Sequence, residues 1–339
     1  MNTTMLLEKT KHYPVMLDQI LSIITPQHGG TFIDCTFGGG GYSEKILKYP
    51  KTKVFAIDRD ESTKVYANSL AKRFPGRFNF SLDKFSNLKQ IFNFNSNTKV
   101  RGIIFDLGLS SLQLADEKRG FSFNSKRSLS MEMGLNDYSA FEVVNNLEKK
   151  KLFNLIKILG EEKEAKAIVN QIVKYREKKT INTSEELSAI INKAKKKNNN
   201  YKKNRSTQTF QAIRIFINQE LTELVQGLIA ATEILEDGGI LIIVSFHSLE
   251  DKIVKNFFNL YSNLKKNPSR YLLLKENQSL LFKLLSKKPT TPSRKEIIQN
   301  IRSRSAKLRY GIRNNNSFYY FKDFKKKFNK YFRINEIKI

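Results

Sequence analysis

The chain has 339 residues, enough for one large domain or two smaller ones, each with a full hydrophobic core. Its 60 lysines and arginines against 32 acidic residues give a net charge of +28, which favours a polyanionic partner, nucleic acid before an anionic membrane surface. The single cysteine, Cys35, excludes a disulfide framework. No apolar run reaches the length of a membrane span, and the N-terminus lacks the apolar core of a signal peptide. We therefore expect a cytoplasmic protein without a membrane partner.

The first third of the chain alternates short apolar runs with helical patterns. The runs that predict strands are 31–36, 53–58, 77–82 and 101–107. Between them, apolar residues recur at helical spacing over 43–49 and 61–74. This alternation predicts an α/β fold with a parallel sheet, whose ligand site lies at the carboxyl ends of the strands.

Four consecutive glycines, residues 38–41, follow the first predicted strand in "FIDCTFGGGGYS". Glycine lets a ligand approach the main chain, and the N-terminus of the next helix favours anionic groups. A dinucleotide fingerprint begun at Gly38 fails at Ser43, and no P-loop pattern is present. Asp34, four residues before the glycines, gives a spacing similar to the first motif of S-adenosylmethionine-dependent methyltransferases. The alternative is a tight turn between strand and helix.

Polar residues follow three of the predicted strands. Asp58 ends the second predicted strand, where it can accept hydrogen bonds from ribose hydroxyls. The alternative is that Asp58 caps the next helix. Asp106 ends the fourth predicted strand in "FDLGLSS", where it could face a cofactor while Ser110 and Ser111 face a substrate amine. The alternative is that these residues only form a turn, which Asp and Ser favour. His247 follows the fifth predicted strand in "SFHSLED". At this position a catalytic role and a structural role are equally compatible with the sequence.

The alternation stops between about Asp116 and Arg205, where no strand is predicted. Helical patterns cover 139–160, 162–179 and 183–197, and Thr183 or Ser184 is expected to cap the last of these helices. We interpret this part as a helical insertion that ends in a basic loop over 193–205.

The α/β pattern then returns. A helix is predicted over 218–235, followed by the turn "EDGG" and a buried strand over 240–246. The tail beyond residue 313 is basic and aromatic. Its cations are expected to contact phosphates and its aromatic rings to stack on exposed bases, unless it is only solvated charge on a compositionally biased chain.

Several quoted motifs occur in one order along the chain. They are "HYPVMLDQIL", "FIDCTFGGGGYS", "AIDRD", "FDLGLSSLQLADEKRGFSF", "STQTFQAIRIFINQEL", "GGILIIVSFHSLEDKIVKNFF" and "NIRSRSAKLR". Together they resemble the bacterial 16S ribosomal RNA N4-cytosine methyltransferases, the RsmH or MraW family, up to about Arg313. "GLSSLQL…RGFSF" and "SFHSLED" are the specific motifs, whereas the glycine cluster alone is weak.

The resemblance implies a class I S-adenosylmethionine-dependent methyltransferase sheet, Rossmann-like, with an inserted all-helical domain. The expected domains are a first methyltransferase part (1–115), the helical insertion for RNA recognition (116–205), a second methyltransferase part (206–313) and the tail (314–339). The cofactor-binding positions implied by the family are Gly40, Gly41, Tyr42, Asp58, Phe85, Asp106 and Gln113. The candidates for catalysis are Asp106, Ser110 and His247, and no metal is expected.

The implied reaction moves a methyl group from S-adenosylmethionine to the exocyclic N4 amine of a cytosine in 16S rRNA of the small ribosomal subunit. Two alternatives stay open: a ribosome-binding factor of the same fold with lost catalysis, and a DNA amino-methyltransferase. The DNA enzymes typically carry Ser/Asn-Pro-Pro-Tyr/Trp after the fourth strand, where this chain has Leu109, Ser110 and Ser111. The sequence leaves a monomer and a homodimer equally open.

This chain departs from the family pattern in two places. Tyr42 stands where the family usually has His. The family's "L-D-M-R-M" is "LSMEM" here, with Ser130 for Asp and Glu132 for Arg, which reverses a charge. The second departure is what keeps the non-catalytic alternative open.

Overall fold

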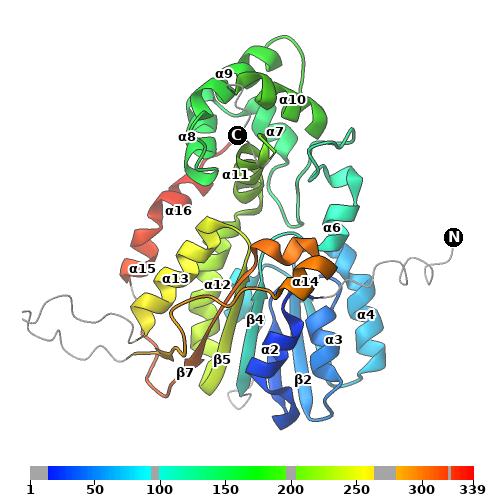
Figure 1. Cartoon of the computed structure of the whole chain (residues 1–339), viewed down its shortest axis with the longest axis vertical. Coiled ribbons are helices and arrows are strands. Elements are labelled where there is room, and N and C mark those ends of the chain that lie inside the picture. The colour runs from blue at the N-terminus through cyan, green and yellow to red at the C-terminus, as the bar shows by residue number, and fades with distance from the viewer. Residues whose placement is uncertain (1–13, 93–98, 196–203, 263–279, 320–321) are drawn as a thin grey trace, which may run out of the picture. The chain divides into compact units, whose positions relative to one another are not determined.

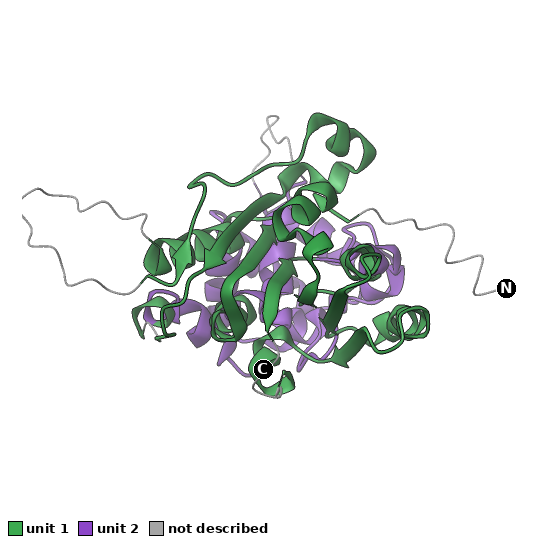
Figure 2. Cartoon of the chain, turned by 90° about the horizontal axis from the view of Figure 1, so that it is seen from below, with its two compact units in different colours: residues 1–108, 223–325 green, residues 109–222, 326–339 purple. Residues whose placement is uncertain are grey.

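The computed structural model describes residues 14–92, 99–195, 204–262, 280–319 and 322–339. Most of the expected basic loop 193–205 lies outside the described residues. The chain divides into two compact units. The first unit holds residues 1–108 and 223–325, and the second holds 109–222 and 326–339 (Figure 2).

The boundaries of the units differ from the expected domain ranges. Residues 206–222 belong to the second unit, because helix α11 (Thr207–Asn218) packs on α7 (Ala140–Asn146) and α8 (Lys149–Leu159). The tail is not a separate segment either, since it is shared between the units at residue 325.

A seven-stranded sheet with the order β3-β2-β1-β4-β5-β7-β6 forms the centre of the first unit (Figure 1). Its strands are β1 (Gly30–Asp34), β2 (Thr52–Asp58), β3 (Phe78–Leu82), β4 (Val100–Asp106), β5 (Leu235–Ser245), β6 (Phe282–Lys283) and β7 (Lys307–Arg313). The first five pair in parallel, whereas β7 is antiparallel to β5 and to β6. The expected parallel sheet is therefore confirmed, and the antiparallel pair at its edge is an addition.

The expected turn at "EDGG" is part of strand β5. Val100 pairs with Leu235 and Gly102 pairs with Ile240, so the register shifts between these two pairs. Gly238 has φ of 76°, which a residue with a side chain rarely adopts. The segment 236–239 is thus a bulge within the strand and not a turn before it.

Helices flank the sheet of the first unit. They are α2 (Leu17–Ile24), α3 (Gly41–Leu47), α4 (Lys64–Arg73), α5 (Leu88–Ile91), α12 (Glu220–Ile234), α13 (Ser248–Tyr261), α14 (Arg294–Gln299) and α15 (Lys322–Lys327), with short 3₁₀ turns at 26–28, 61–63, 85–87 and 301–305. α3 packs on β2, α4 on β3, and α13 on both β5 and β7. Their apolar faces close a core with the sheet that includes Phe32, Ile104 and Val244.

The second unit is helical. Besides α7, α8 and α11 it contains α6 (Ser111–Ala115), α9 (Ala165–Arg176), α10 (Ser184–Ala194) and α16 (Asn329–Asn335), with a 3₁₀ turn at 117–119. Thr183 caps α10 as expected, since its hydroxyl accepts from the Glu186 N–H at 3.1 Å. Across both units, no described helix has the length and apolarity needed to cross a membrane.

Three aromatic residues of the tail are buried, which contradicts the expectation that they stack on bases. Phe324, Phe328 and Tyr331 are each at most 2% exposed. Phe324 packs on Phe257 of α13 with ring centroids 5.4 Å apart, and Phe328 stacks on Tyr331 at 6.0 Å. These three rings are core residues of the units and are not available to bases. Phe318, Tyr319 and Phe332 are half-buried, and residues 320–321 lie outside the described part of the chain.

Candidate active site

The glycine loop joins β1 to α3 and exposes its main chain on one side. Gly40 has φ of 79°, and a Cβ atom there would lie 2.8 Å from the Phe37 ring. A Cβ on Gly41 would lie 2.3 Å from Pro14, whereas one on Gly39 would meet nothing within 4 Å. The inner side of the loop is therefore packed against the protein, and the outer side at Gly39 is open to a ligand.

Asp58 holds this loop from the end of β2. Its Oδ2 accepts a hydrogen bond from the Gly38 N–H at 2.7 Å, and its Oδ1 accepts from the Asp60 N–H at 2.9 Å. Burial raises the pKa of the Asp58 carboxyl to about 6, partly offset by these two hydrogen bonds. Each carboxylate oxygen keeps a second lone pair, so Asp58 can still accept hydrogen bonds from a sugar.

Asp34 is a further acid at this edge of the sheet, and it was not among the expected site residues. It ends β1 and is fully buried. Its Oδ2 accepts from the Ser43 hydroxyl at 2.7 Å and its Oδ1 from the Thr36 N–H at 3.3 Å, while burial raises its pKa to about 6. Asp34 therefore fixes both ends of the glycine loop. Its spacing four residues before the glycines was the sequence signal for this role.

Asp106 ends β4 and pairs with Tyr42. The Tyr42 hydroxyl lies 2.5 Å from the Val15 carbonyl oxygen, to which it donates, and 3.2 Å from Asp106 Oδ2. The other oxygen, Oδ1, is buried and has no hydrogen-bond partner among the described residues. Burial raises the pKa of Asp106 to about 8 and that of Tyr42 well above its usual range. An orphaned carboxyl oxygen of this kind indicates a site for a polar ligand.

Phe85 stands at the end of β3, where a 3₁₀ turn begins. Its ring meets Phe105 edge to face with centroids 5.2 Å apart. A Cβ on Gly227 of α12 would lie 2.7 Å from the same ring, so only glycine allows this approach. The half-buried ring is thus fixed in place and can present an apolar surface to an adenine.

The strand order brings these residues together. β2, β1 and β4 are neighbours in the sheet and run in parallel, so Asp58, Asp34 and Asp106 end at the same carboxyl edge. The residues present fit S-adenosylmethionine: an open main-chain loop, a carboxylate with free lone pairs, an apolar ring and an orphaned carboxyl oxygen.

His247 is a helix cap in this structure. Its Nδ1 accepts from the Glu250 N–H at 3.4 Å, and its Nε2 lies 3.1 Å from Glu250 Oε1. The Glu250 carboxylate also accepts from the Phe246 and His247 N–H groups at 2.8 and 3.2 Å. The geometry therefore accounts for His247 as the N-cap of α13, and its catalytic role stays a prediction.

Ser110 and Gln113 lie in the second unit and form a capping box at the start of α6. The Gln113 side chain accepts from the Ser110 N–H at 3.0 Å, and the Ser110 hydroxyl accepts from the Gln113 N–H at 3.1 Å. Gln113 is 5% exposed and also donates to the Met133 carbonyl at 3.3 Å. Both side chains thus stabilise their own helix, and their roles toward cofactor and substrate remain predictions.

Comparison with known proteins agrees with this geometry. Residues 9–313 match the model of the MraW methylase family. The chain belongs to the MraW methylase family. It is 43% identical over 299 residues to "Ribosomal RNA small subunit methyltransferase H" of Ehrlichia canis, covering 88% of this chain and 98% of that protein. A protein of the same name from Ehrlichia ruminantium is 44% identical over 300 residues, which cover 88% of this chain and 98% of that protein. Another, from Orientia tsutsugamushi, is 42% identical over 309 residues, which cover 90% of this chain and 98% of that protein.

Membership of the MraW methylase family confirms the predicted resemblance, the class I methyltransferase fold and the activity as an S-adenosylmethionine-dependent methyltransferase. The residues beyond 313 lie outside the family match. The tail helix α16 is therefore a feature that this chain adds to the family pattern.

The two residues that replace the family's Asp and Arg interact with each other. The Ser130 hydroxyl donates to Glu132 Oε2 at 2.5 Å, and the Arg119 guanidinium donates to the Glu132 carbonyl at 3.4 Å. The Glu132 carboxylate therefore has a local hydrogen-bond donor in Ser130, whereas Arg119 contacts only its main chain.

Proposed function

We propose that this methyltransferase transfers the methyl group of S-adenosylmethionine to the exocyclic N4 amine of a cytosine in small-subunit (16S) ribosomal RNA. The observation that carries the proposal is the orphaned Oδ1 of Asp106, which lies at the same sheet edge as the open glycine loop held by Asp58. The names of the relatives support ribosomal RNA as the substrate class.

The cofactor supplies an electrophilic methyl group on a sulfonium. Gly40 and Gly41 let the loop pack against Phe37 and Pro14, which leaves the main chain at Gly39 bare where the amino acid portion is expected. Asp58 accepts hydrogen bonds from the ribose hydroxyls. Phe85 presents its ring to the adenine. Tyr42 is too buried to contact much of a ligand, and its proposed role is to hold Asp106 Oδ2.

The N4 amine of cytosine is a poor nucleophile because its lone pair is delocalised into the ring. A hydrogen bond from the amine to Asp106 Oδ1 would localise the lone pair and orient it for in-line attack. The ionised carboxylate can also accept the proton that the amine loses, and burial, which raises the pKa of Asp106 to about 8, makes it a stronger base than an exposed carboxylate. Ser110, Gln113 and His247 are secondary candidates for contacts with the base or the cofactor.

The base has to leave any stack to reach Asp106, which costs less in irregular RNA than in a duplex. We propose that the helical insertion, residues 116–205, takes part in holding the RNA. Because assembly of the small subunit supplies the substrate, we also propose a cytoplasmic location and association with the ribosome. The buried free thiol of Cys35 is compatible with a reducing compartment.

The test is methyl transfer by the purified chain to small ribosomal subunits that lack the modification, followed by mass mapping of the nucleosides. The expected product is a single N4-methylated cytidine in the ribosomal RNA. Binding of S-adenosylmethionine without transfer would favour a ribosome-binding factor that has lost catalysis. Transfer only to amines of DNA would favour the second alternative.

A further inference from the structure

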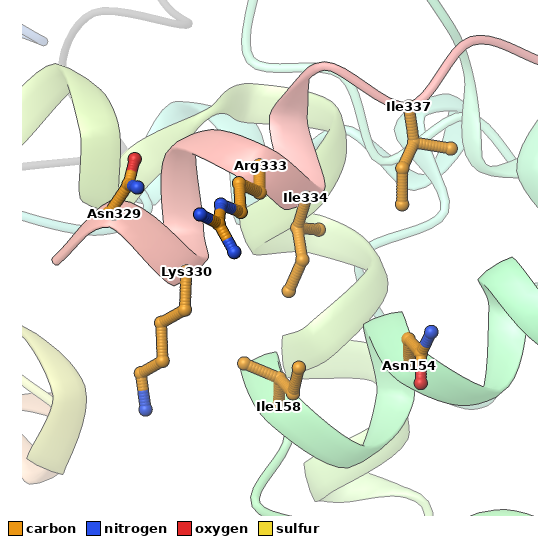
Figure 3. A pocket seen from close by; sticks show the side chains of 7 residues that line it. All are labelled: Asn154, Ile158, Asn329, Lys330, Arg333, Ile334 and Ile337. Atoms are coloured by element: carbon orange, nitrogen blue, oxygen red, sulfur yellow. The ribbon is translucent and has the colours of Figure 1, made fainter.

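A cavity of about 550 Å³ lies in the second unit between α8 and the tail, remote in sequence from the active-site motifs (Figure 3). Its size falls within the range of clefts that hold small ligands. The lining residues come from α8, α16 and the segment that follows, and are Asn154, Ile158, Asn329, Lys330, Arg333, Ile334 and Ile337. Every lining residue except the two from α8 lies beyond the family match, so this chain builds the cavity with its own tail. We call it the tail groove.

Among the described residues, the lining of the tail groove contains two cations, Lys330 and Arg333, and no acidic residue. The Arg333 guanidinium has no hydrogen-bond or ion-pair partner among the described residues. The Lys330 ammonium lies 5.0 Å from the centroid of the Tyr331 ring and has no acidic partner within the same part of the chain. Both side chains are exposed. Two exposed cations that lack an acidic partner favour an anionic ligand.

The groove also offers hydrogen bonds and an apolar surface. The side-chain amides of Asn154 and Asn329 have no partner within the part of the chain that the structure describes. Ile158 and Ile337 supply apolar surface, whereas Ile334 is buried and points toward α8 in Figure 3. Cations beside amides and an apolar surface match the parts of a nucleotide: phosphate, base edge and sugar or base face.

Buried contacts hold α16 in place, so the groove does not depend on a loose tail. Tyr331 and Ile334 are 1% and 4% exposed. The Asn335 side chain donates to the Thr222 hydroxyl at 2.6 Å, and the Lys151 ammonium donates to the Lys338 carbonyl at 3.3 Å. A helix fixed by its buried face presents its other side chains in a constant geometry.

We propose that the tail groove binds a single-stranded segment of the ribosomal RNA substrate, with Arg333 and Lys330 on phosphate oxygens. This inference rests on the proposed function. RNA is the occupant we commit to because the chain carries a net charge of +28 and the groove combines unpaired cations with amide and apolar contacts.

The test compares the full-length double variant Lys330→Ala/Arg333→Ala with the wild type. Binding of a fluorescein-labelled single-stranded RNA of mixed sequence is measured by anisotropy at several salt concentrations. We expect affinity to fall roughly tenfold and the salt slope to fall by about 1 to 2, because two phosphate contacts are lost. The KM for small subunits should rise while kcat and the affinity for S-adenosylmethionine stay unchanged.

The matched control is Lys48→Ala/Lys72→Ala, which removes two charges from exposed lysines of the first unit, outside both the groove and the helical insertion. Arg333→Lys keeps the charge and should keep most of the affinity. Equal losses in the control, or unchanged RNA affinity in the double variant, would overturn the proposal. A loss of affinity for intact subunits but not for RNA would point to a protein partner and would overturn it as well.

Failure of the proposed function is a separate result. If the wild type transfers no methyl group to small subunits, the RNA-binding comparison still decides whether the tail groove holds RNA.

Discussion

Asp58 has two tasks at the end of β2. It fixes the glycine loop through the Gly38 N–H at 2.7 Å, and it is the residue proposed to hold the ribose. The two tasks use different lone pairs of the same carboxylate, so a substitution affects both.

We predict that Asp58→Ala lowers the affinity for S-adenosylmethionine by roughly 3 kcal/mol, about a hundredfold, because hydrogen bonds to a charged acceptor are lost. Titration calorimetry measures the affinity, and circular dichroism shows whether the fold persists. Asp58→Asn is the matched variant, because it keeps one carbonyl oxygen for the Gly38 N–H. Unchanged affinity in the alanine variant would reject the ribose role.

Asp106 binds its proton more tightly in the folded chain than in the unfolded chain. Burial is the largest cause, and it raises the pKa from 3.8 to about 8. The stability that this group contributes is therefore complete below pH 3.8 and is lost as the pH rises toward 8. Asp34 and Asp58 act in the same direction, but their contribution ends near pH 6.

Between pH 6 and 8, the ligand-free wild type should lose stability faster than Asp106→Asn, by at most about 1.4 kcal/mol per pH unit. The asparagine cannot ionise, so it removes this part of the pH dependence. Urea unfolding of both proteins at pH 6.0, 7.0 and 8.0 measures the difference. Parallel stability curves would contradict a raised pKa at this residue.

At the scale of elements, the turn from β1 to α3 has a packed side and an open side. Gly40 requires glycine for two reasons, a φ of 79° and the Phe37 ring, whereas Gly39 has neither constraint and is exposed. The folded chain alone gives no reason for glycine at position 39. A ligand against the loop does.

We expect Gly39→Ala to leave the free energy of unfolding within about 0.5 kcal/mol of the wild type and to weaken S-adenosylmethionine binding at least about tenfold. Gly40→Ala should destabilise the chain by roughly 2 to 4 kcal/mol, through the left-handed backbone and the clash with Phe37. Thermal unfolding and calorimetry separate the two effects. Full affinity in the first variant would remove the loop from the cofactor site.

The ends of β1, β2 and β4 were predictable to within two residues, because buried parallel strands are continuous apolar runs. Strands β6 and β7 were not predicted. β7 reads "KLRYGIR", with charged residues throughout, and it becomes a strand by pairing with β5. Such a strand is stabilised by distant backbone partners that a local pattern does not contain.

At the scale of the whole molecule, the charge of +28 bears on binding to RNA. We predict that the logarithm of the affinity for small-subunit RNA falls with the logarithm of the salt concentration with a slope steeper than about −3, because several phosphates release counterions. Binding of S-adenosylmethionine, measured in the same buffers, serves as the control. A flat response of RNA binding to salt would reject the basic surface as its cause.

The tail shows how composition alone misleads. Its richness in Lys, Phe and Tyr predicted rings available for bases, yet Phe324, Phe328, Tyr331 and Ile334 are buried. These residues are spaced by four, three and three positions, which is the period of one helix face. That spacing was the sequence signal that indicated a packed tail.

The sequence by itself determined the class of the sheet, the glycine loop and the acids at the strand ends, because these follow from local apolar runs and from residue types with few alternative uses. Only the tertiary structure decided that Asp106 Oδ1 lacks a partner among the described residues and that α16 closes a groove with α8. Each of these depends on which side chains meet across long separations in the chain. These long-range contacts determine which groups are buried and which are hydrogen-bonded, and no short segment of the sequence specifies them.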